Sequence, residues 1–329
     1  MALLLRGGVE VDAGKLTQGE VIALINYMSQ ILLSLLRSGG SGRFGHPRTG
    51  QLAMRVNEIL NTHTTMQDPG TAELAVNDAA EAAKFEHVTF TYKDAGAPSL
   101  TDITFTARPG ETIGVIGGTG SGKSTLIDLV CRFYDADNGG VALFDHDVKQ
   151  YSFAQLRRLV GVVPQQAVLF TGTIRDNMQW AAPGASDEEI WQALEIAQAA
   201  EFVRGKPGML DAPVETAGRN FSGGQRQRLT IARALVPKPK ILILDDSASA
   251  LDFATDAALR KAIKEETHGM TVFIVSQRAA SVQRADHILV LDDGKLVGDA
   301  PHAELLRSCE VYKEICLSQL SKEEVAKTL

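Results

Sequence analysis

Cysteine is scarce in this 329-residue chain, and basic residues are not in excess. Its three cysteines, Cys131, Cys309 and Cys316, are too few and too scattered for a disulfide framework or a tetrahedral zinc site, so they fit a reducing compartment. Lysine and arginine total 33 against 40 acidic residues, which gives a formal net charge of −7. Proteins that bind nucleic-acid backbones normally carry an excess of basic residues, so we expect no nucleic-acid partner.

Long hydrophobic runs are also missing. The longest apolar stretch, residues 21–36, has 16 residues and is interrupted by Asn26 and Gln30, whereas a straight membrane-spanning helix needs about 20. The polar, glycine-rich RSGGSGRFGHPRTG that follows predicts a loop over 37–53. Taken alone, the stretch predicts either a buried or interfacial helix or a truncated membrane-spanning one.

The rest of the chain has an ordinary globular composition, with 44% hydrophobic and 22% charged residues. From residue 85 onward, short β-branched runs alternate with helical patterns, which is typical of a mainly parallel, doubly wound α/β sheet. Residues 54–61 predict a short amphipathic helix, 62–84 a connector, and 150–235 a mostly helical insertion. We expect strands at 85–92, 103–107, 112–116, 159–163, 241–245, 272–276 and 288–292, and helices at 124–133, 188–200, 224–236, 255–266 and 301–319.

Residues 117–124, GGTGSGKS, fit the phosphate-loop pattern G-x-x-x-x-G-K-[ST] between an apolar strand and an apolar helix. Glycines let backbone N–H groups curl around phosphate oxygens, and the helix that follows adds its positive end. A glycine turn with an incidental Lys-Ser is the alternative, which this context disfavours. The expected nucleotide-binding residues here are Gly117, Gly118, Thr119, Gly120, Ser121, Gly122, Lys123, Ser124 and Thr125. Lys123 is expected to reach the β- and γ-phosphates of ATP, and the Ser124 hydroxyl to ligate Mg²⁺.

A second motif narrows the class of nucleotide-binding protein that the sequence predicts. The sequence FSGGQ at 221–225 is followed by RQRLTIARAL and then by ILILD, which ends at Asp245. Together these resemble the signature, its helix and the Walker B strand of an ATP-binding-cassette (ABC) ATPase. Tyr92 is similar to the aromatic residue that stacks on adenine in that family, Gln165 in VVPQQAVLF to the Q-loop glutamine, and SALD at 249–252 to the D-loop. The resemblance covers residues 85–320, and the sequences of its motifs are most similar to those of ABC exporters of the multidrug or lipid type.

The N-terminal part resembles such exporters too. GKLTQGEVIALINYMSQILLSLL is similar to the loop and the start of their last transmembrane helix, and RVNEILNT to the segment that leads to the ATPase domain. Between them, RSGGSGRFGHPRTGQ departs from the family, where the helix should continue as apolar residues. A local reading-frame change would produce such a stretch.

The resemblance implies a P-loop NTPase (RecA-like) core with a mainly parallel sheet, an N-terminal antiparallel β region and an α-helical subdomain at about 150–235. It divides the chain into a transmembrane remnant at 1–36, an irregular linker with a short helix at 37–84, and the ATPase domain at 85–329. It implies attachment to the transmembrane domains of an exporter at the cytoplasmic face of the cell membrane.

The resemblance also implies a head-to-tail dimer with a second nucleotide-binding domain. Residues Ser222, Gly223, Gly224 and Gln225 of the signature then complete the partner's ATP site. Ser222 is also expected to cap the helix that follows it. Mg²⁺ is expected on Ser124, Gln165 and Asp245. The plainer alternatives are a surface turn for SGG, a helix cap for Asp245, packing for Tyr92 and a surface amide for Gln165.

Two positions depart from the family's catalytic pattern. Asp246 stands where the Walker B glutamate normally positions the attacking water, and Gln277 stands where the switch histidine normally lies. An aspartate is one methylene too short, and an amide cannot become cationic or relay a proton. The combination resembles the degenerate subunit of a heterodimeric exporter, whose partner carries the intact Glu and His. A homodimer with two slow sites, a non-hydrolysing nucleotide-binding fragment, and a soluble ABC ATPase unconnected with transport are the alternatives.

Overall fold

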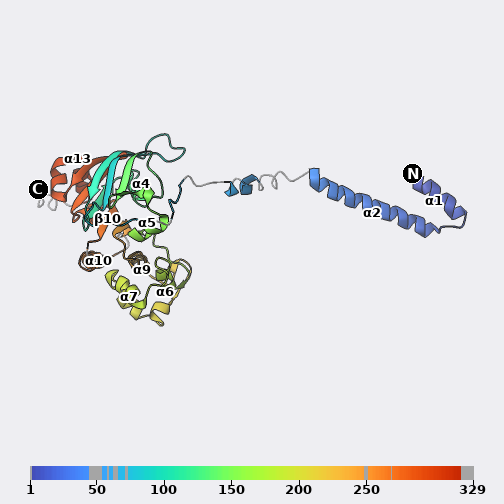
Figure 1. Ribbon diagram of the computed structural model, residues 1–329. Coiled ribbons are helices and arrows are strands. Elements are labelled where there is room, and N and C mark those ends of the chain that lie inside the picture. Colours follow the sequence, from blue (N-terminus) through green and yellow to red (C-terminus); the bar gives the residue numbers. More distant parts are fainter. Residues whose placement is uncertain are drawn as a thin grey trace. The chain divides into compact units, whose positions relative to one another are not determined.

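The computed structural model describes residues 2–43, 54–57, 59–61, 66–70, 73–247, 251–267 and 269–319. The chain forms two compact units, Met1–Thr65 and Met66–Leu329. Figure 1 shows both units.

The first unit contains helix α1, Ala2–Asp12, and helix α2, Gln18–Arg43. Thr17 and Glu20 hydrogen-bond to each other's backbone N–H at the start of α2, which satisfies donors that a helix start leaves open. The prediction of a loop from residue 37 was wrong for 37–43, because adding residues to an existing helix is far easier than starting one. Residues 44–53 lie outside the described residues. None of the described helices combines the length and apolarity that crossing a membrane requires.

The second unit begins with a four-stranded sheet in the order β2-β1-β4-β5, in which every neighbouring pair is antiparallel. Phe85 of β1 stacks on Phe105 of β2, and both rings are buried. The glycine-rich sequence NGGVAL gave no strand signal, so β4 was not predicted. The bounds are β1 Ala83–Phe90, β2 Leu100–Ala107, β4 Asn138–Leu143 and β5 His146–Asp147.

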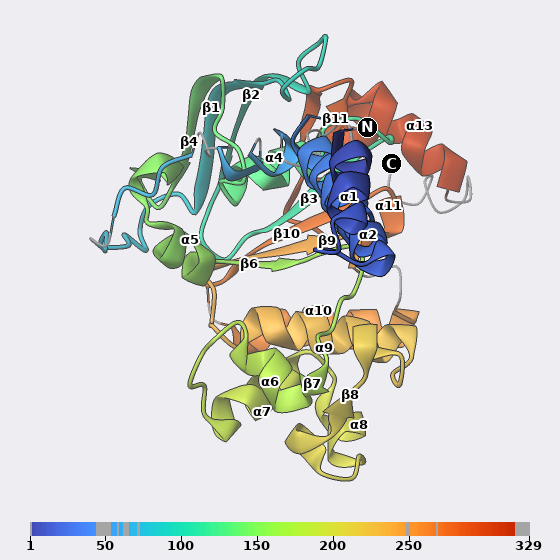
Figure 2. The same ribbon diagram turned by 90° about the vertical axis from the view of Figure 1, so that its right-hand side faces the viewer.

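A six-stranded sheet in the order β12-β11-β3-β10-β9-β6 forms the centre of the unit (Figure 2). All its pairs are parallel except β11–β12. Strand β9 shows why its sequence is apolar throughout: Ile241 and Ile243 enter one core cluster, while Leu242 and Leu244 enter the other. The bounds are β3 Thr112–Gly117, β6 Val160–Val163, β9 Ile241–Asp245, β10 Thr271–Ser276, β11 His287–Asp292 and β12 Lys295–Ala300.

Helices pack around this sheet or form a separate helical part beside it. The sheet is accompanied by α4 Lys123–Val130, α5 Phe153–Leu159, α10 Phe253–Glu266, α11 Ala279–Val282, α12 His302–Ser308 and α13 Glu310–Gln319. The helical part contains α6 Ile174–Gln179, α7 Asp187–Ile196, α8 Ala200–Arg204 and α9 Gly223–Leu235, with the short pair β7 Gly172–Thr173 and β8 Pro213–Val214. The helix expected at 301–319 is two helices that break at Cys309.

Two predicted boundaries shift. Because β6 pairs with β9 in the central sheet, the helical part begins after residue 163 rather than at 150. Part of the expected linker belongs to the second unit: Gln155 accepts from the Leu74 N–H at 3.0 Å and donates to the Leu74 carbonyl at 2.7 Å. Arg132 donates to the carbonyl of Gln67 at 3.0 Å. The chain therefore joins the second unit well before residue 85.

Candidate functional site

The predicted phosphate loop lies between β3 and α4. Its two left-handed positions are Gly120, with φ +80°, and Gly122, with φ +98°. A side chain at Gly122 would place its Cβ 2.8 Å from the Ser99 carbonyl oxygen, so both conformation and space require glycine there. Gly118, Thr119 and Gly120 are exposed, and the loop thus presents its backbone to solvent.

Lys123 opens α4 and is buried. Its ammonium donates to the carbonyls of Gly117 at 2.9 Å and Gly118 at 2.6 Å. Burial lowers the pKa of Lys123, while the charges of Asp245 and Asp246 act in the opposite direction. The lysine is therefore held inside the loop, within electrostatic reach of the two carboxylates that end β9.

Strand register explains why these distant segments meet. Val115 of β3 pairs with Val275 of β10, and Val275 pairs in turn with Asp245 of β9. Since these strands are parallel, their carboxyl ends share one edge of the sheet, where ligands of open α/β sheets normally bind. Strand β6 ends at the same edge, because Val163 pairs with Leu244. The edge consequently gathers the phosphate loop, both aspartates, and the segments that carry Gln165 and Gln277.

The two aspartates differ in their surroundings. Burial and the neighbouring charge of Asp246 raise the pKa of Asp245, whereas Lys123 lowers it. Asp246 is a non-glycine residue with φ +42°, a conformation that aspartate tolerates better than most side chains. Its Oδ1 accepts a hydrogen bond from the Ser276 hydroxyl at 3.2 Å. The sequence reasoning missed Ser276, although a polar residue that ends an apolar strand is a usable signal.

Tyr92 lies against the start of α4. Its hydroxyl donates to Thr125 Oγ1 at 3.1 Å and contacts Asp128 at 3.4 Å, and its ring meets Phe90 and Tyr134 edge-to-face. Packing accounts for this position, and adenine stacking stays a prediction. Burial raises the pKa of Asp128, and the nearby charge of Asp245 raises it further. Asp128 was not predicted; its place one turn after Ser124 on the same helix was the available signal.

The remaining predicted side chains at this edge are open to solvent. Ser124, Gln165 and Gln277 are all exposed. Of the D-loop segment, Ser249 and Ala250 lie outside the described residues. Asp252 caps α10 by accepting from the Thr255 N–H at 2.9 Å. Among the described residues, no group of three or more His, Cys, Asp or Glu side chains could hold a metal ion.

The signature sequence lies in the helical part, at the start of α9. Ser222 caps this helix, as predicted: its Oγ accepts from the Gln225 N–H at 3.3 Å, and Gln225 Oε1 accepts from the Ser222 N–H at 3.0 Å. A Cβ on Gly223 would meet no atom within 4 Å, so the helix start faces open space. Over the described part of the chain, no hydrogen bond or ion pair joins residues 222–225 to the phosphate loop. Figure 2 shows α9 in the helical part and α4 beside the sheet.

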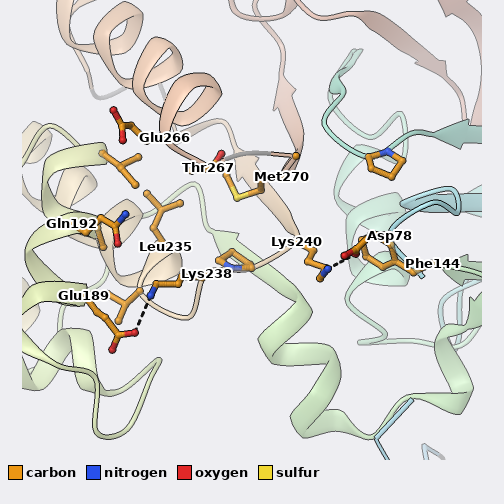
Figure 3. Close-up of a pocket in the computed structure, with 16 residues that line it drawn as sticks. Asp78, Phe144, Glu189, Gln192, Leu235, Lys238, Lys240, Glu266, Thr267 and Met270 are labelled. Carbon is orange, nitrogen blue, oxygen red and sulfur yellow. Dashed lines mark hydrogen bonds and ion pairs between the residues drawn. The ribbon is translucent and has the colours of Figure 1, made fainter. Parts of the chain in front are cut away.

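A cavity of about 500 Å³ lies at the opposite edge of the sheet (Figure 3). Its lining includes Pro109, Lys240 and Met270, which precede β3, β9 and β10 and so mark the amino ends of these strands. Lys240 pairs with Asp78 and Lys238 pairs with Glu189. These ion pairs satisfy both lysines, and the cavity is separate from the phosphate loop.

Comparison with known proteins agrees with this geometry. The family model described as ABC transporter matches residues 100–249. The chain contains an ABC transporter ATP-binding domain. An uncharacterized ABC transporter ATP-binding protein of Mycobacterium tuberculosis is 38% identical over 97% of this chain and 55% of the relative. A probable multidrug resistance ABC transporter ATP-binding/permease protein of Bacillus subtilis is 36% identical over 94% of this chain and 52% of its own length.

A solved structure of an ABC exporter has the same fold as this chain. The structure of a bacterial Atm1-family ABC exporter with ATP bound superposes with a TM-score of 0.75 and 32% identity, covering 92% of this chain and 53% of that one. The expected ABC ATPase fold, with its mainly parallel sheet, antiparallel β region and helical part, is confirmed. The chain spans about half the length of the proteins it matches.

Proposed function

We propose that the second unit binds MgATP at the carboxyl edge of its central sheet and powers export as part of an ABC transporter dimer. The observation that carries this proposal is the convergence of the glycine loop, the buried ammonium of Lys123 and the carboxylates of Asp245 and Asp246. A triphosphate needs backbone N–H groups and a cation at one place, and this edge supplies both.

Each residue has a defined part in this proposal. The loop from Gly117 to Gly122 wraps the phosphates, and Lys123 exchanges its two carbonyl partners for phosphate oxygens. Ser124, Gln165 and Asp245 offer hydroxyl, amide and carboxylate oxygens, the donor set that Mg²⁺ prefers, and Asp245 is half-buried beside Lys123. When bound, Mg²⁺ neutralises charge on the β- and γ-phosphates. Tyr92 stacks on the adenine.

Hydrolysis at this site is slow in our proposal. Asp246 is directed to Ser276 by a hydrogen bond, and its carboxylate is one methylene shorter than the glutamate that the family uses. Gln277 is exposed and offers an amide where a group able to carry a proton is needed. A nucleotide-binding chain that does not hydrolyse ATP is the second candidate, and these two residues favour it.

The signature serves another subunit in this proposal. The space around Gly223 at the start of α9 is open, and α9 lies in the helical part whereas α4 lies beside the sheet (Figure 2). A head-to-tail dimer places residues Ser222, Gly223, Gly224 and Gln225 on the γ-phosphate of the partner's ATP. The partner is a second nucleotide-binding domain, and a different subunit with intact Glu and His restores full turnover at the site that this signature completes.

The contact with transmembrane domains falls on the groove between sheet and helical part. A cavity of about 320 Å³ there is lined by Phe133, Trp180, Arg157 and Arg233 and by no carboxylate among its described lining residues. Phe133 and Trp180 are exposed by 47% and 67%, and Arg233 Nη1 is buried without a hydrogen-bond partner in the described chain. Helix α2 exposes a run of apolar side chains suited to neighbouring helices or lipid. These features support our proposal that the ATPase works at the cytoplasmic face of the membrane.

Two measurements test the proposal. The full chain should bind a fluorescent ATP analogue with Mg²⁺, and Lys123→Ala should weaken binding about 10- to 100-fold, because a charged hydrogen-bond donor is lost. Thr119→Cys with Ser222→Cys should then be linked by a short bifunctional thiol reagent. Since Cys131, Cys309 and Cys316 are buried, the engineered pair dominates the reaction. Covalent dimers formed with MgATP support the dimer; absence of nucleotide binding, or links within single chains, contradicts the proposal.

A further inference from the structure

The last described helix, α13, ends on the segment that carries Gln277. The side-chain amide of Gln319 makes two hydrogen bonds to this segment. Its Nε2 donates to the Gln277 carbonyl at 2.8 Å, and its Oε1 accepts from the Ala279 N–H at 2.9 Å. One amide thus satisfies an acceptor and a donor two residues apart, as a neighbouring strand would.

The same segment is held from its other side by the end of β9. Ser276 Oγ donates to Asp246 Oδ1 at 3.2 Å and accepts from the Arg278 N–H at 3.1 Å. The backbone of residues 276–279 is therefore fixed between the Walker B end and α13. The Gln277 side chain remains exposed.

The position of Gln319 follows from how α13 is packed. Tyr312 and Cys316, on the same helix, are fully buried, and the Tyr312 hydroxyl hydrogen-bonds to His302 Nδ1 at 2.7 Å. Cys316 lies three residues before Gln319, so the amide projects one turn beyond a rigid anchor. The neighbouring Ser318 side chain donates to the Ile315 carbonyl at 2.8 Å, within its own helix and with no hydrogen bond to residues 276–279 in the described chain. Ser318 thus provides a matched control position.

We propose that Gln319 is a positioning residue for the nucleotide site: its amide brackets residues 277–279 and so sets where the Gln277 side chain meets the terminal phosphate. This proposal rests on the proposed ATP site. These two hydrogen bonds couple α13 to a segment that we expect to face the terminal phosphate, which ATP carries and ADP lacks. In the described part of the chain, no hydrogen bond joins Gln319 to the phosphate loop or to the two aspartates.

The test uses the full chain and the variants Gln319→Ala, Gln319→Glu and the control Ser318→Ala. Amide hydrogen exchange measures the contact between Gln319 and residues 277–279 directly, because the Ala279 N–H donates to the Gln319 side chain. In Gln319→Ala we expect exchange at Ala279 to rise about tenfold, the value of one neutral hydrogen bond. Gln319→Glu keeps an acceptor for Ala279 but faces the Gln277 carbonyl with a second acceptor, so Ala279 stays protected. Ser318→Ala should match the wild type.

Nucleotide affinity gives the second readout. We expect Gln319→Ala and Gln319→Glu to weaken ATP binding about three- to tenfold and to leave ADP binding unchanged. Equal losses for ATP and ADP, or no loss for either, overturn the positioning role. Unchanged hydrogen exchange at Ala279 in Gln319→Ala overturns the claim that Gln319 holds the backbone of residues 277–279. Failure of the wild-type chain to bind either nucleotide refutes the proposed function instead, and the separate measurements distinguish these failures.

Discussion

Asp246→Glu combined with Gln277→His replaces the two residues that depart from the family's catalytic pattern. The double variant should convert the slow ATP site that we propose into a competent one. The glutamate extends the carboxylate by about 1 Å, a displacement of the size that can change a rate about 100-fold. The histidine adds a group able to accept or relay a proton, and such assistance is worth about 10² to 10⁴. The two changes act on one phosphate, so their effects should not simply add.

From the structure we expect this variant to lose a little stability. Asp246 has φ +42° and is engaged by the Ser276 hydroxyl. Glutamate lacks the short side chain that eases the left-handed conformation, so we expect a loss of about 1 kcal/mol in the free energy of unfolding. ATP affinity should stay within roughly threefold of the wild-type value, because a histidine at position 277 can still donate a hydrogen bond to the terminal phosphate, as the amide can.

Single-turnover cleavage of labelled ATP, with the chain in excess over nucleotide, measures the effect. We expect a rise of about 100-fold over the wild type. The matched control is Asp246→Gln with Gln277→His, which has the same length but no carboxylate at position 246. Equal rates in the control and the test variant would refute the reasoning. So would wild-type turnover of about 1 s⁻¹ or faster, the range of ordinary enzymes.

Two further outcomes follow from local contacts. Ser222→Ala removes one half of the capping box of α9 and should lower the free energy of unfolding by about 1 kcal/mol, measured by urea denaturation. Ser222→Asp retains a capping oxygen and should recover most of this loss. Equal losses in both variants would exclude the cap as the cause. The hydrogen bond from His287 to Asp299 raises the pKa of His287 above its ordinary 6.5, against the effect of burial. The stability from this pair is therefore complete below about pH 6.5 and is lost as pH rises through the raised pKa. Denaturation curves between pH 6 and 9 should show this loss, and His287→Gln should flatten it; a wild-type profile no steeper than that of the variant would contradict the assignment.

Much of the fold followed from local pattern. The apolar runs of β3, β9, β10 and β11 were predicted to within one residue, because strands buried on both faces must be apolar along their whole length. Strands β4 and β12 were missed, since one is glycine-rich and the other alternates exposed with half-buried residues. The attachment of Leu74 to Gln155 also escaped prediction, because this contact joins residues far apart in the sequence.

For the site, the sequence by itself predicted the chemistry. The glycines, Lys123 and Ser124 stand at the spacing of a phosphate-binding loop, Asp245 ends an apolar strand, and Ser222 of the signature caps its own helix. Tertiary structure alone decided the rest: strand register brings Asp245 and Asp246 to Lys123, Ser276 engages Asp246, and Gln319 holds the backbone beside Gln277. Spacing along the chain specifies local backbone geometry, whereas these contacts depend on how separate elements pack, and no short-range pattern records that.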